Sequence, residues 1–341
     1  MPDGPRILLV RLDGLGDALA CVPSLEGLRR ALPGAHFDAV CSAKNASLFN
    51  PERVERVYEF PAADGTDGLI AQLRDRRYTA CMVATEEPIG YRLAGASGAP
   101  RRAGFWHRFE KPFKSWWQFA QLTDRVYRPA AWIADPVHEV VALYGLAECI
   151  GAHAPAPDDA ASLRSWLAVD RTGADETRAL TLALQMNQKW TSGDWGPAAI
   201  GAFADAVFAA SRFAHLVMLA SSHDEGLARA VLEHMVRGAA SAGRITLRAA
   251  LPMQRWLGEI ARADAIVTPD TGAAHAAGML GVPVVDLFDA TRYDQLSRRW
   301  RPWAAPSRCL IKPAYRAGIE DAFANEVAAA LADIAPLSRN A

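Results

Sequence analysis

An acidic residue follows a pair of glycines at the end of the first apolar run of the sequence. The run ends at Leu12, and Gly14 and Gly16 permit a tight turn in which the backbone approaches a ligand closely. Asp17 then falls in the first turn of the next expected helix. An acid here would repel a pyrophosphate, and position 19, where a dinucleotide-binding turn needs a third small residue, holds leucine. A carboxylate displayed in a cleft suits a general base instead.

This first turn has more than one interpretation. Asp17 could serve only as the N-terminal cap of the helix, a common use of aspartate that contributes about 1 kcal/mol. Asp13 lies on the same loop and is the other candidate for a catalytic or acceptor-binding part. The spacing alone leaves these alternatives open.

A second turn places small residues and a hydroxyl at the start of a helix. A strand is predicted to end at Pro269, after which Asp270, Thr271 and Gly272 open a helix of small residues, with His275 on the same face as Thr271. Small residues let backbone amides reach a phosphate, and a helix start attracts anions. The helix dipole contributes only about 0.3–1 kcal/mol at an exposed site, so diphosphate binding also needs a cation. The alternative is a capped helix with a hydrogen-bonded histidine.

Residues 101–128 combine basic with aromatic side chains. In the N-terminal half of the chain such a cluster could bind an anionic, lipid-linked acceptor at a membrane surface. The predicted acceptor contacts are Arg101, Arg102, Arg108 and Lys111. The alternative is a solvated loop with packed aromatic residues.

Strands and helices that must position these residues alternate along the chain in two sets. The first set predicts strands at Arg6–Leu12, Phe37–Ser42, Arg56–Phe60 and Thr79–Thr85, and a helix from about Asp17 to Leu32. The second predicts strands at 179–186, 215–221, 245–248, 264–268 and 282–288, and helices at 197–211, 225–237, 253–263 and after Thr271. This alternation indicates an α/β protein with two parallel sheets, each a Rossmann-like half. Ligands in such sheets bind at the carboxyl ends of the strands.

The boundary between the halves is predicted in the Ala-, Pro- and Asp-rich stretch 155–176, which has the composition of a loop. We therefore expect an N-terminal domain at 1–168, a C-terminal domain at 172–318 and a C-terminal helix at 319–335. Apolar residues in that helix recur at steps of three and four, so the helix should pack back on the protein. They are Ile319, Phe323, Val327, Leu331 and Ile334.

Composition limits the possible partners and location of the protein. The chain has 341 residues, 51% of them apolar, and a formal net charge of −1, so no global positive field exists to hold nucleic acid. Five scattered cysteines without a Cys-x-x-Cys pair argue against a disulfide framework or a zinc site. No secretory or membrane-spanning segment is visible, and a cytoplasmic location is expected.

Both turns resemble the lipopolysaccharide heptosyltransferases of glycosyltransferase family 9. The resemblance in the first turn covers residues 11–18, RLDGLGDA, followed by Val22-Pro23-Ser24-Leu25. In the second turn it covers Asp270-Thr271-Gly272, His275 and Ala277, followed by Gly281-x-Pro283-Val284. His138, ahead of Leu143 and Gly151, is similar to a further stretch of that family.

The resemblance implies a GT-B fold of two facing Rossmann-like domains, ADP-heptose as donor and no requirement for a metal. By position, Asp17 would be the general base that deprotonates the acceptor hydroxyl. Thr271 and Gly272 would hold the diphosphate, with His275 supporting their loop. Asp270 would meet the sugar hydroxyls. The remaining donor contacts implied are Asp224 or Glu225 for the ribose and Leu251–Gln254, with Met253, for the adenine.

Two departures from the family bear on the donor site. A Lys-x-Trp-Pro-like step usually follows the first strand of the second domain, with the lysine on phosphate. If Trp195 fills the tryptophan position here, the lysine position holds Gly193, and Lys189 must reach in from a longer loop. The family's Phe-Gly-Pro-Thr turn is replaced by residues 288–291, FDAT, whose extra carboxylate could alter donor choice.

The predicted function is inverting transfer of a heptose-like sugar from a nucleotide diphosphate to lipopolysaccharide core or a related glycan, with transient contact to the inner membrane. Within the same class, the alternatives are a GT-B glycosyltransferase with another donor or acceptor, or an epimerase of this architecture. Two alternatives come from other classes of protein. One is a nicotinamide-dependent Rossmann oxidoreductase, and the other is a non-catalytic sugar-binding relative. The missing third glycine and the acid at the first helix start count against the oxidoreductase.

Overall fold

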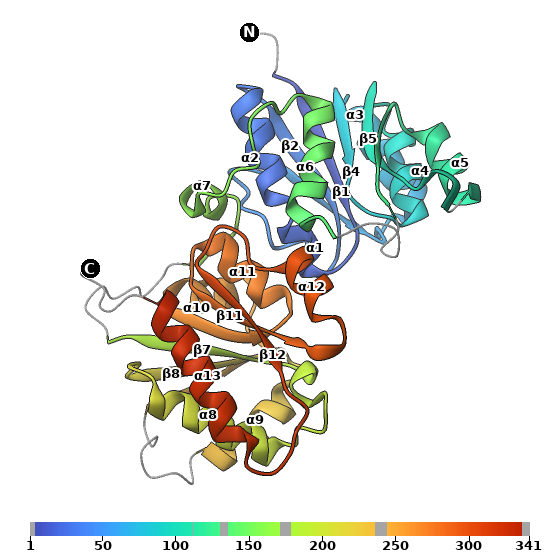
Figure 1. Ribbon diagram of the computed structural model, residues 1–341. Coiled ribbons are helices and arrows are strands. Elements are labelled where there is room, and N and C mark those ends of the chain that lie inside the picture. Colours follow the sequence, from blue (N-terminus) through green and yellow to red (C-terminus); the bar gives the residue numbers. More distant parts are fainter. Residues whose placement is uncertain (1–3, 111, 130–135, 171–178, 236–243, 336–341) are drawn as a thin grey trace. The chain divides into compact units, whose positions relative to one another are not determined.

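A computed structural model describes residues 4–110, 112–129, 136–170, 179–235 and 244–335 (Figure 1). The chain divides into two compact units, unit 1 at residues 1–168 and unit 2 at residues 169–341. Each unit is built around its own six-stranded sheet. Within the described residues, no helix combines the length and the apolar composition that crossing a membrane requires.

The sheet of unit 1 has the order β3-β2-β1-β4-β5-β6, and every neighbouring pair is parallel. Its strands are β1 (Arg6–Arg11), β2 (His36–Ser42), β3 (Arg56–Phe60), β4 (Ala80–Val83), β5 (Arg101–Trp106) and β6 (Asp124–Tyr127). All carboxyl ends therefore lie on one edge, where the loops after β1, β4, β5 and β6 gather.

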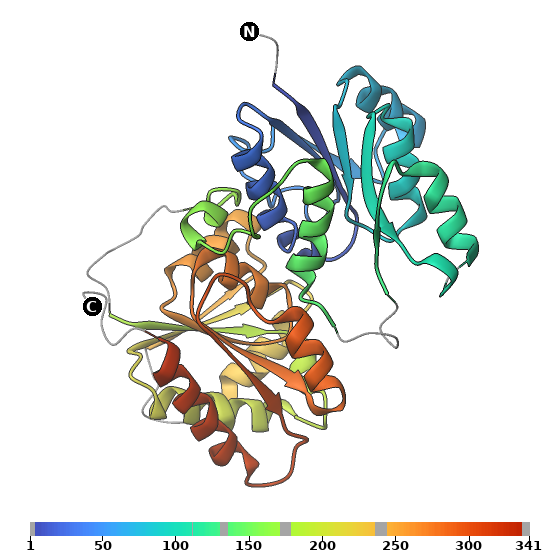
Figure 2. The same cartoon turned by 45° about the horizontal axis from the view of Figure 1, so that its top comes forward.

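Helices cover both faces of this sheet (Figures 1 and 2). Helices α2 (Val22–Ala31) and α6 (Glu139–Ile150) pack together on one face, and α3 (Gly65–Asp75), α4 (Pro88–Ala96) and α5 (Pro112–Gln121) lie on the other. The shorter helices of unit 1 are α1 (Leu15–Leu19), the 3-10 turn η1 (Arg108–Glu110) and α7 (Ala160–Arg164).

The sheet of unit 2 has the order β12-β11-β10-β7-β8-β9, again with only parallel pairs. Its strands are β7 (Thr181–Met186), β8 (His215–Ala220), β9 (Ile245–Ala249), β10 (Ala265–Pro269), β11 (Val284–Asp289) and β12 (Ser307–Lys312). Its helical elements are η2 (Gln188–Thr191), α8 (Pro197–Ala210), α9 (Glu225–Met235), α10 (Met253–Arg262), α11 (Gly272–Leu280), η3 (Ala290–Arg292), α12 (Tyr293–Trp300) and α13 (Ile319–Ile334).

The last helix, α13, packs against α8 within unit 2. Its predicted apolar stripe is confirmed, since Phe323, Val327 and Leu331 are buried in the core of this unit. Phe323 stacks on Phe203 of α8 with ring centroids 4.9 Å apart, and Trp195 contacts both rings edge-on or tilted. This aromatic contact fixes the chain after β7, where the predicted phosphate-binding lysine lies.

The predicted fold class, two parallel α/β sheets, is confirmed, but several elements differ from expectation. The single helix predicted from Asp17 to Leu32 is two helices, α1 and α2, and Pro23 in the first turn of α2 marks the new start. Helix α7 lies inside the stretch 155–176 that was expected to be loop. Strands β5, β6 and β12 were missed. Part of the predicted boundary, residues 171–178, lies outside the described residues.

Candidate functional site

Predicted donor-binding residues follow four adjacent strands of unit 2. Asp270 and Thr271 come after β10, Lys189 after β7, Asp224 and Glu225 after β8, and Met253 after β9. Because these strands are parallel neighbours, the four loops line one edge of the sheet in that order. Strands are spaced about 4.8 Å apart, so the row of loops extends over about 14 Å. A ligand with a phosphate end and a nucleoside end matches such a row.

The β10–α11 turn presents backbone amides at the start of a buried helix. Thr271 is the N-cap of α11, with extended backbone angles, and its hydroxyl accepts a hydrogen bond from the amide of Ala273 at 3.3 Å. The Thr271 hydroxyl is also 3.0 Å from that of Thr268. Every residue of α11 from Ala273 to Leu280 is buried. The amides of Gly272 and its neighbours therefore sit on a rigid support and point out of the helix start.

His275 lies in the second turn of α11 and is 7% exposed. Its ring contacts the Trp300 ring edge-on, with centroids 5.5 Å apart. A Cβ on Gly278, one turn further along, would meet the carbonyl oxygen of Trp303 at 2.5 Å, so the segment after α12 packs closely on α11. The supporting role of His275 for the Thr271–Gly272 loop stays a prediction.

Lys189 reaches the turn that carries Asp270. Its Nζ donates to the Asp270 carbonyl oxygen and lies 3.1 Å from Oδ2 of the same residue, while the side chain stays 56% exposed. Trp190 and Trp195, which follow Lys189 in the chain, are buried in the core of unit 2. The two tryptophans therefore anchor the longer loop, and Lys189 is the cation that this loop brings to the start of α11.

Lys312, which the sequence analysis missed, ties this loop to the end of β12. It is only 4% exposed, donates to the Ser192 carbonyl oxygen, and its Nζ lies 5.7 Å from the centre of the Trp195 ring. Burial lowers the pKa of this lysine, and the nearby Asp289 carboxylate opposes that effect. Asp289 in turn accepts from the Ser192 hydroxyl at 2.8 Å. Asp289 is the extra carboxylate by which the 288–291 turn departs from the family's Phe-Gly-Pro-Thr turn. Its hydrogen bond with Ser192 thus holds the loop that carries Lys189.

A second buried group, Asp286, lies in β11 beside the same turn. Its side chain is fully buried, and it is in register with Thr268 of β10. Burial, and then the charge of Asp270, raise the pKa of Asp286 well above its ordinary value. Its carboxyl group is therefore kept neutral more readily than an exposed one.

The two acids after β8 differ in their surroundings. Asp224 is 8% exposed and accepts a hydrogen bond from the Ser221 hydroxyl at 2.6 Å. Glu225 begins α9 and pairs with Arg229 one turn later. Asp224 is thus fixed by its loop, whereas Glu225 lies on the helix surface. Met253 begins α10 and is partly exposed at the neighbouring strand end.

In unit 1, Asp17 lies at the carboxyl end of β1 against a buried arginine. The Arg11 guanidinium contacts Oδ1 of Asp17, lies 3.3 Å from the Asp13 carboxylate and donates to the Ala84 carbonyl oxygen. Gly14, not Asp17, is the N-cap of α1, and its amide donates to Oδ2 of Asp17 at 3.2 Å. Asp17 thus contributes to the helix start and keeps 29% of its side chain exposed.

The basicity of Asp17 is set by opposing neighbours. Burial raises its pKa, the Arg11 charge lowers it, and the charges of Asp13 and Glu139 raise it, with a net increase above the ordinary value. A higher pKa makes the carboxylate a stronger base. The sequence pointed to Arg11 only as part of a motif. In the structure, its guanidinium contacts the Asp17 carboxylate and orients it.

A charged cluster continues along the same edge of unit 1. Glu86 follows β4, and its carboxylate lies 3.2 Å from the His107 ring and 3.7 Å from Arg128. Arg128 also pairs with the buried Glu139 at 2.7 Å. This cluster joins the ends of β4, β5 and β6 to the start of α6.

Three of the four predicted basic acceptor contacts are described by the structure, and these three are not brought together. Arg101 and Arg102 lie at the start of β5, on the edge opposite to Asp17, because the strand runs parallel to β1. Their guanidinium groups are held by carbonyl oxygens, Arg101 by Cys149 and Ile150, and Arg102 by Gln121 and Ala99. Only Arg108 follows the carboxyl end of β5. Lys111 lies outside the described residues.

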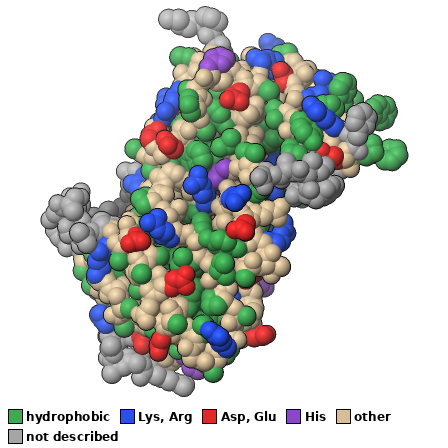
Figure 3. All heavy atoms as spheres, in the orientation of Figure 1, with side chains coloured by type: hydrophobic (Ala, Val, Ile, Leu, Met, Phe, Trp, Pro, Cys, Tyr) green, Lys and Arg blue, Asp and Glu red, His purple; other side chains and the backbone are tan. Residues whose placement is uncertain are grey.

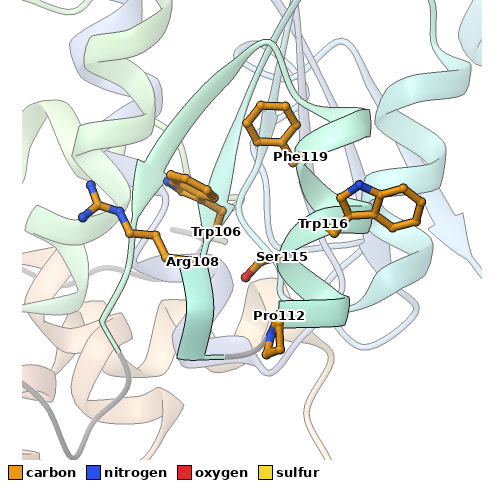
Figure 4. Close-up of a pocket in the computed structure, with 6 residues that line it drawn as sticks. All are labelled: Trp106, Arg108, Pro112, Ser115, Trp116 and Phe119. Atoms are coloured by element: carbon orange, nitrogen blue, oxygen red, sulfur yellow. The ribbon is translucent and has the colours of Figure 1, made fainter.

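Arg108 belongs to an aromatic pocket between the end of β5 and α5 (Figure 4). The pocket has a volume of about 720 Å³. Its lining consists of Trp106, Arg108, Pro112, Ser115, Trp116 and Phe119. The Arg108 guanidinium lies over the Tyr127 ring, 4.3 Å from its centre, and 5.6 Å from that of Trp106.

A family model of glycosyltransferases matches part of unit 2. Residues 200–321 match the model of glycosyltransferase family 9 (heptosyltransferase). The matched segment holds all the predicted donor-binding residues except Lys189. The predicted resemblance to this family is therefore confirmed. No curated protein sequence matches the chain.

Solved structures extend the shared GT-B fold to both units. The glycosyltransferase family 9 protein of Veillonella parvula DSM 2008 is 18% identical, with a TM-score of 0.70 and 96% of each chain covered. E. coli ADP-heptose LPS heptosyltransferase II is 16% identical, with a TM-score of 0.70 over 96% of this chain and 99% of that one. E. coli heptosyltransferase WaaC with ADP is 18% identical, with a TM-score of 0.69 over 94% and 99%. WaaC is also known with ADP-2-deoxy-2-fluoro heptose.

Proposed function

We propose that this glycosyltransferase moves a heptose-like sugar from ADP-heptose to a lipopolysaccharide core or related glycan, in the cytoplasm. The observation that carries the donor assignment is the row of loops on the edge of unit 2, which lies within the family match except for Lys189. The structural neighbour WaaC carries ADP and an ADP-heptose analogue in its solved structures, which supports the same donor here.

In the proposed donor complex, the diphosphate rests on the amides of Thr271 and Gly272. Lys189 exchanges its contact with Asp270 for the phosphate oxygens, and the freed Asp270 meets sugar hydroxyls. Asp224 or Glu225 accepts from the ribose, and the adenine lies along Met253 and the start of α10. Amides and one cation together supply the donors that a diphosphate requires.

The proposed reaction is a single displacement with inversion at the anomeric carbon. The acceptor hydroxyl loses its proton to Asp17 as its oxygen forms the new bond to that carbon. The bond from the carbon to the diphosphate oxygen breaks on the opposite side, and ADP leaves with the electron pair. General-base assistance of this kind is typically worth about 10²–10⁴-fold, and stabilisation of leaving-group charge adds a comparable factor.

Unit 1 supplies the acceptor side of the proposal. Asp17, with Arg11 and Asp13, acts on the hydroxyl, and Arg108 is the basic residue on the same edge that an anionic acceptor would meet. No metal takes part in the proposed step. Among the described residues, no group of three or more His, Cys, Asp or Glu side chains is placed to hold a metal ion.

A donor screen tests this proposal. The change in melting temperature is measured with ADP-heptose and with UDP-, GDP- and dTDP-sugars, followed by assays of sugar release with and without a metal chelator. We expect ADP-heptose to stabilise most and the activity to survive chelation. Preference for a uridine or guanine nucleotide would remove the heptose assignment, and stabilisation by NAD rather than ADP would point to an oxidoreductase.

A further inference from the structure

Helix α5 of unit 1 exposes three large aromatic side chains. Phe113 is 89% exposed, Trp116 is 79% exposed and Phe119 is 46% exposed. They follow one another at steps of three residues, so they lie along one side of the helix. We call these three residues the aromatic edge. Among the described residues, no other large aromatic side chain is exposed.

The aromatic edge is not needed to attach α5 to the sheet. The opposite side of the helix does this, with Ser115 and Gln118 buried and Trp117 in edge-on contact with Tyr91 of α4. The Ser115 hydroxyl also accepts from the His107 amide at 3.2 Å. An exposed apolar patch beyond what the core requires marks a surface for interaction.

The pocket of Figure 4 adjoins the aromatic edge and shares two of its residues. Trp116 and Phe119 extend from α5 on one side, and Trp106 ends β5 on the other, with Arg108 just after it. Within the described residues, the Arg108 guanidinium lies over aromatic rings and within ion-pair distance of no carboxylate. An apolar pocket beside a cation with no acidic partner suits an amphipathic ligand with a negative group.

The charge of the surrounding segment gives the sign of that ligand. Of the basic residues in segment 101–128, Arg108 lines the pocket, and the Arg125 guanidinium lies over the Phe119 ring, 3.4 Å from its centre. Figure 3 shows hydrophobic side chains projecting over α5, with Lys and Arg side chains nearby. Basic residues beside exposed Trp and Phe are the composition of a helix that lies in the interface of an anionic membrane.

We propose that the aromatic edge docks unit 1 on the surface of an anionic phospholipid bilayer. The rings of Phe113, Trp116 and Phe119 enter the zone between headgroups and acyl chains, and Arg108 meets lipid phosphate. The pocket takes in part of one lipid molecule. This docking does not depend on the donor chemistry of unit 2, and it would bring the enzyme to a lipid-linked acceptor.

Co-sedimentation with lipid vesicles tests the docking. The intact chain is mixed with vesicles of phosphatidylcholine plus phosphatidylglycerol, or of phosphatidylcholine alone, at low and high salt. We expect binding to the anionic vesicles that weakens with salt. Phe113→Ser with Trp116→Ser should reduce the binding constant about tenfold or more, because two large apolar side chains are lost from the interface.

Matched variants make the result specific. Val141→Ser with Ile311→Ser removes apolar residues of 45% and 42% exposure elsewhere and should leave vesicle binding unchanged. Stabilisation by ADP should be the same in both double variants, so a failure of docking is separable from a failure of the donor assignment. The proposal is overturned if the native chain ignores anionic vesicles, or if the aromatic variant binds them normally. A dimer that disappears in the aromatic variant would also overturn it, because a second copy would then cover this face.

Discussion

The carboxyl edges of the two sheets differ in how they handle charge. In unit 2 each loop contributes one or two groups, and Lys189, which contacts Asp270, keeps 56% of its side chain exposed beside the start of α11. In unit 1 the charged groups pair with each other, Arg11 with Asp13 and Asp17, and Arg128 with Glu86 and Glu139. A phosphate site needs donors free to turn to the ligand. A base needs a carboxylate whose charge its neighbours already balance.

The largest effect is expected from removal of the proposed base. Asp17→Asn keeps the shape and can still accept from the Gly14 amide, but it cannot take a proton at neutral pH. Turnover should fall by about 10²-fold or more. ADP affinity, measured by calorimetry, should stay nearly unchanged, because the donor residues lie in unit 2. Near-normal turnover in this variant would show that Asp17 is not the base. The proposed difference in function between the carboxyl edges of the two sheets would then be wrong.

The next largest effect should appear in unit 2. Lys189→Met removes a charged hydrogen-bond donor while keeping the length of the side chain. ADP affinity should fall by about 10- to 100-fold. Lys44→Met, at an exposed lysine of unit 1, is the control and should bind ADP normally. Unchanged affinity in Lys189→Met would show that another group meets the diphosphate.

A smaller effect is expected from Lys312, which positions the loop of Lys189 without touching the donor. Lys312→Met should raise the KM for the donor about fivefold, the value of one hydrogen bond, and leave kcat nearly unchanged. Steady-state kinetics at varied donor concentration separate the two constants. A fall in kcat at constant KM would contradict a positioning role.

The smallest effect concerns pH. The charge of Asp13 helps to raise the pKa of Asp17, so Asp13→Asn should lower that pKa. Because Asp17 must be ionised to act, activity is lost as pH falls through its pKa. The acid limb of kcat/KM should therefore move to lower pH in Asp13→Asn. Loss of activity at every pH would identify Asp13, rather than Asp17, as the base.

The sequence allowed the general fold to be predicted wherever strands are buried. The fully buried strand β7 lies within the predicted strand 179–186, and the second turn was found because glycine and small residues follow an apolar run. Strands β6 and β12 escaped prediction because charged residues stand beside their short apolar runs, and most of their residues are only partly buried. Strand β5 begins with two arginines, which hid its apolar second half.

The partners of the site residues were harder to predict than the residues themselves. Asp17 and Thr271 adjoin turns whose local sequence is informative. Arg11 donates to the carbonyl oxygen of Ala84, and Lys312 donates to that of Ser192. Both acceptors lie far from their donors in the sequence and come near them only in the folded sheet. The same reasoning explains why Arg101 and Arg108 were grouped. They are close in sequence, but a strand separates them and places them at opposite ends of the sheet.

A crystal structure of the chain with an inert ADP-heptose analogue and a glycan acceptor is the most direct test of the central claim. The account predicts the diphosphate on the amides of Thr271 and Gly272. It also predicts the Asp17 carboxylate within about 2.6–3.2 Å of an acceptor hydroxyl that faces the anomeric carbon. An analogue bound with its diphosphate at that helix start, but with Asp17 far from both sugars, would contradict it.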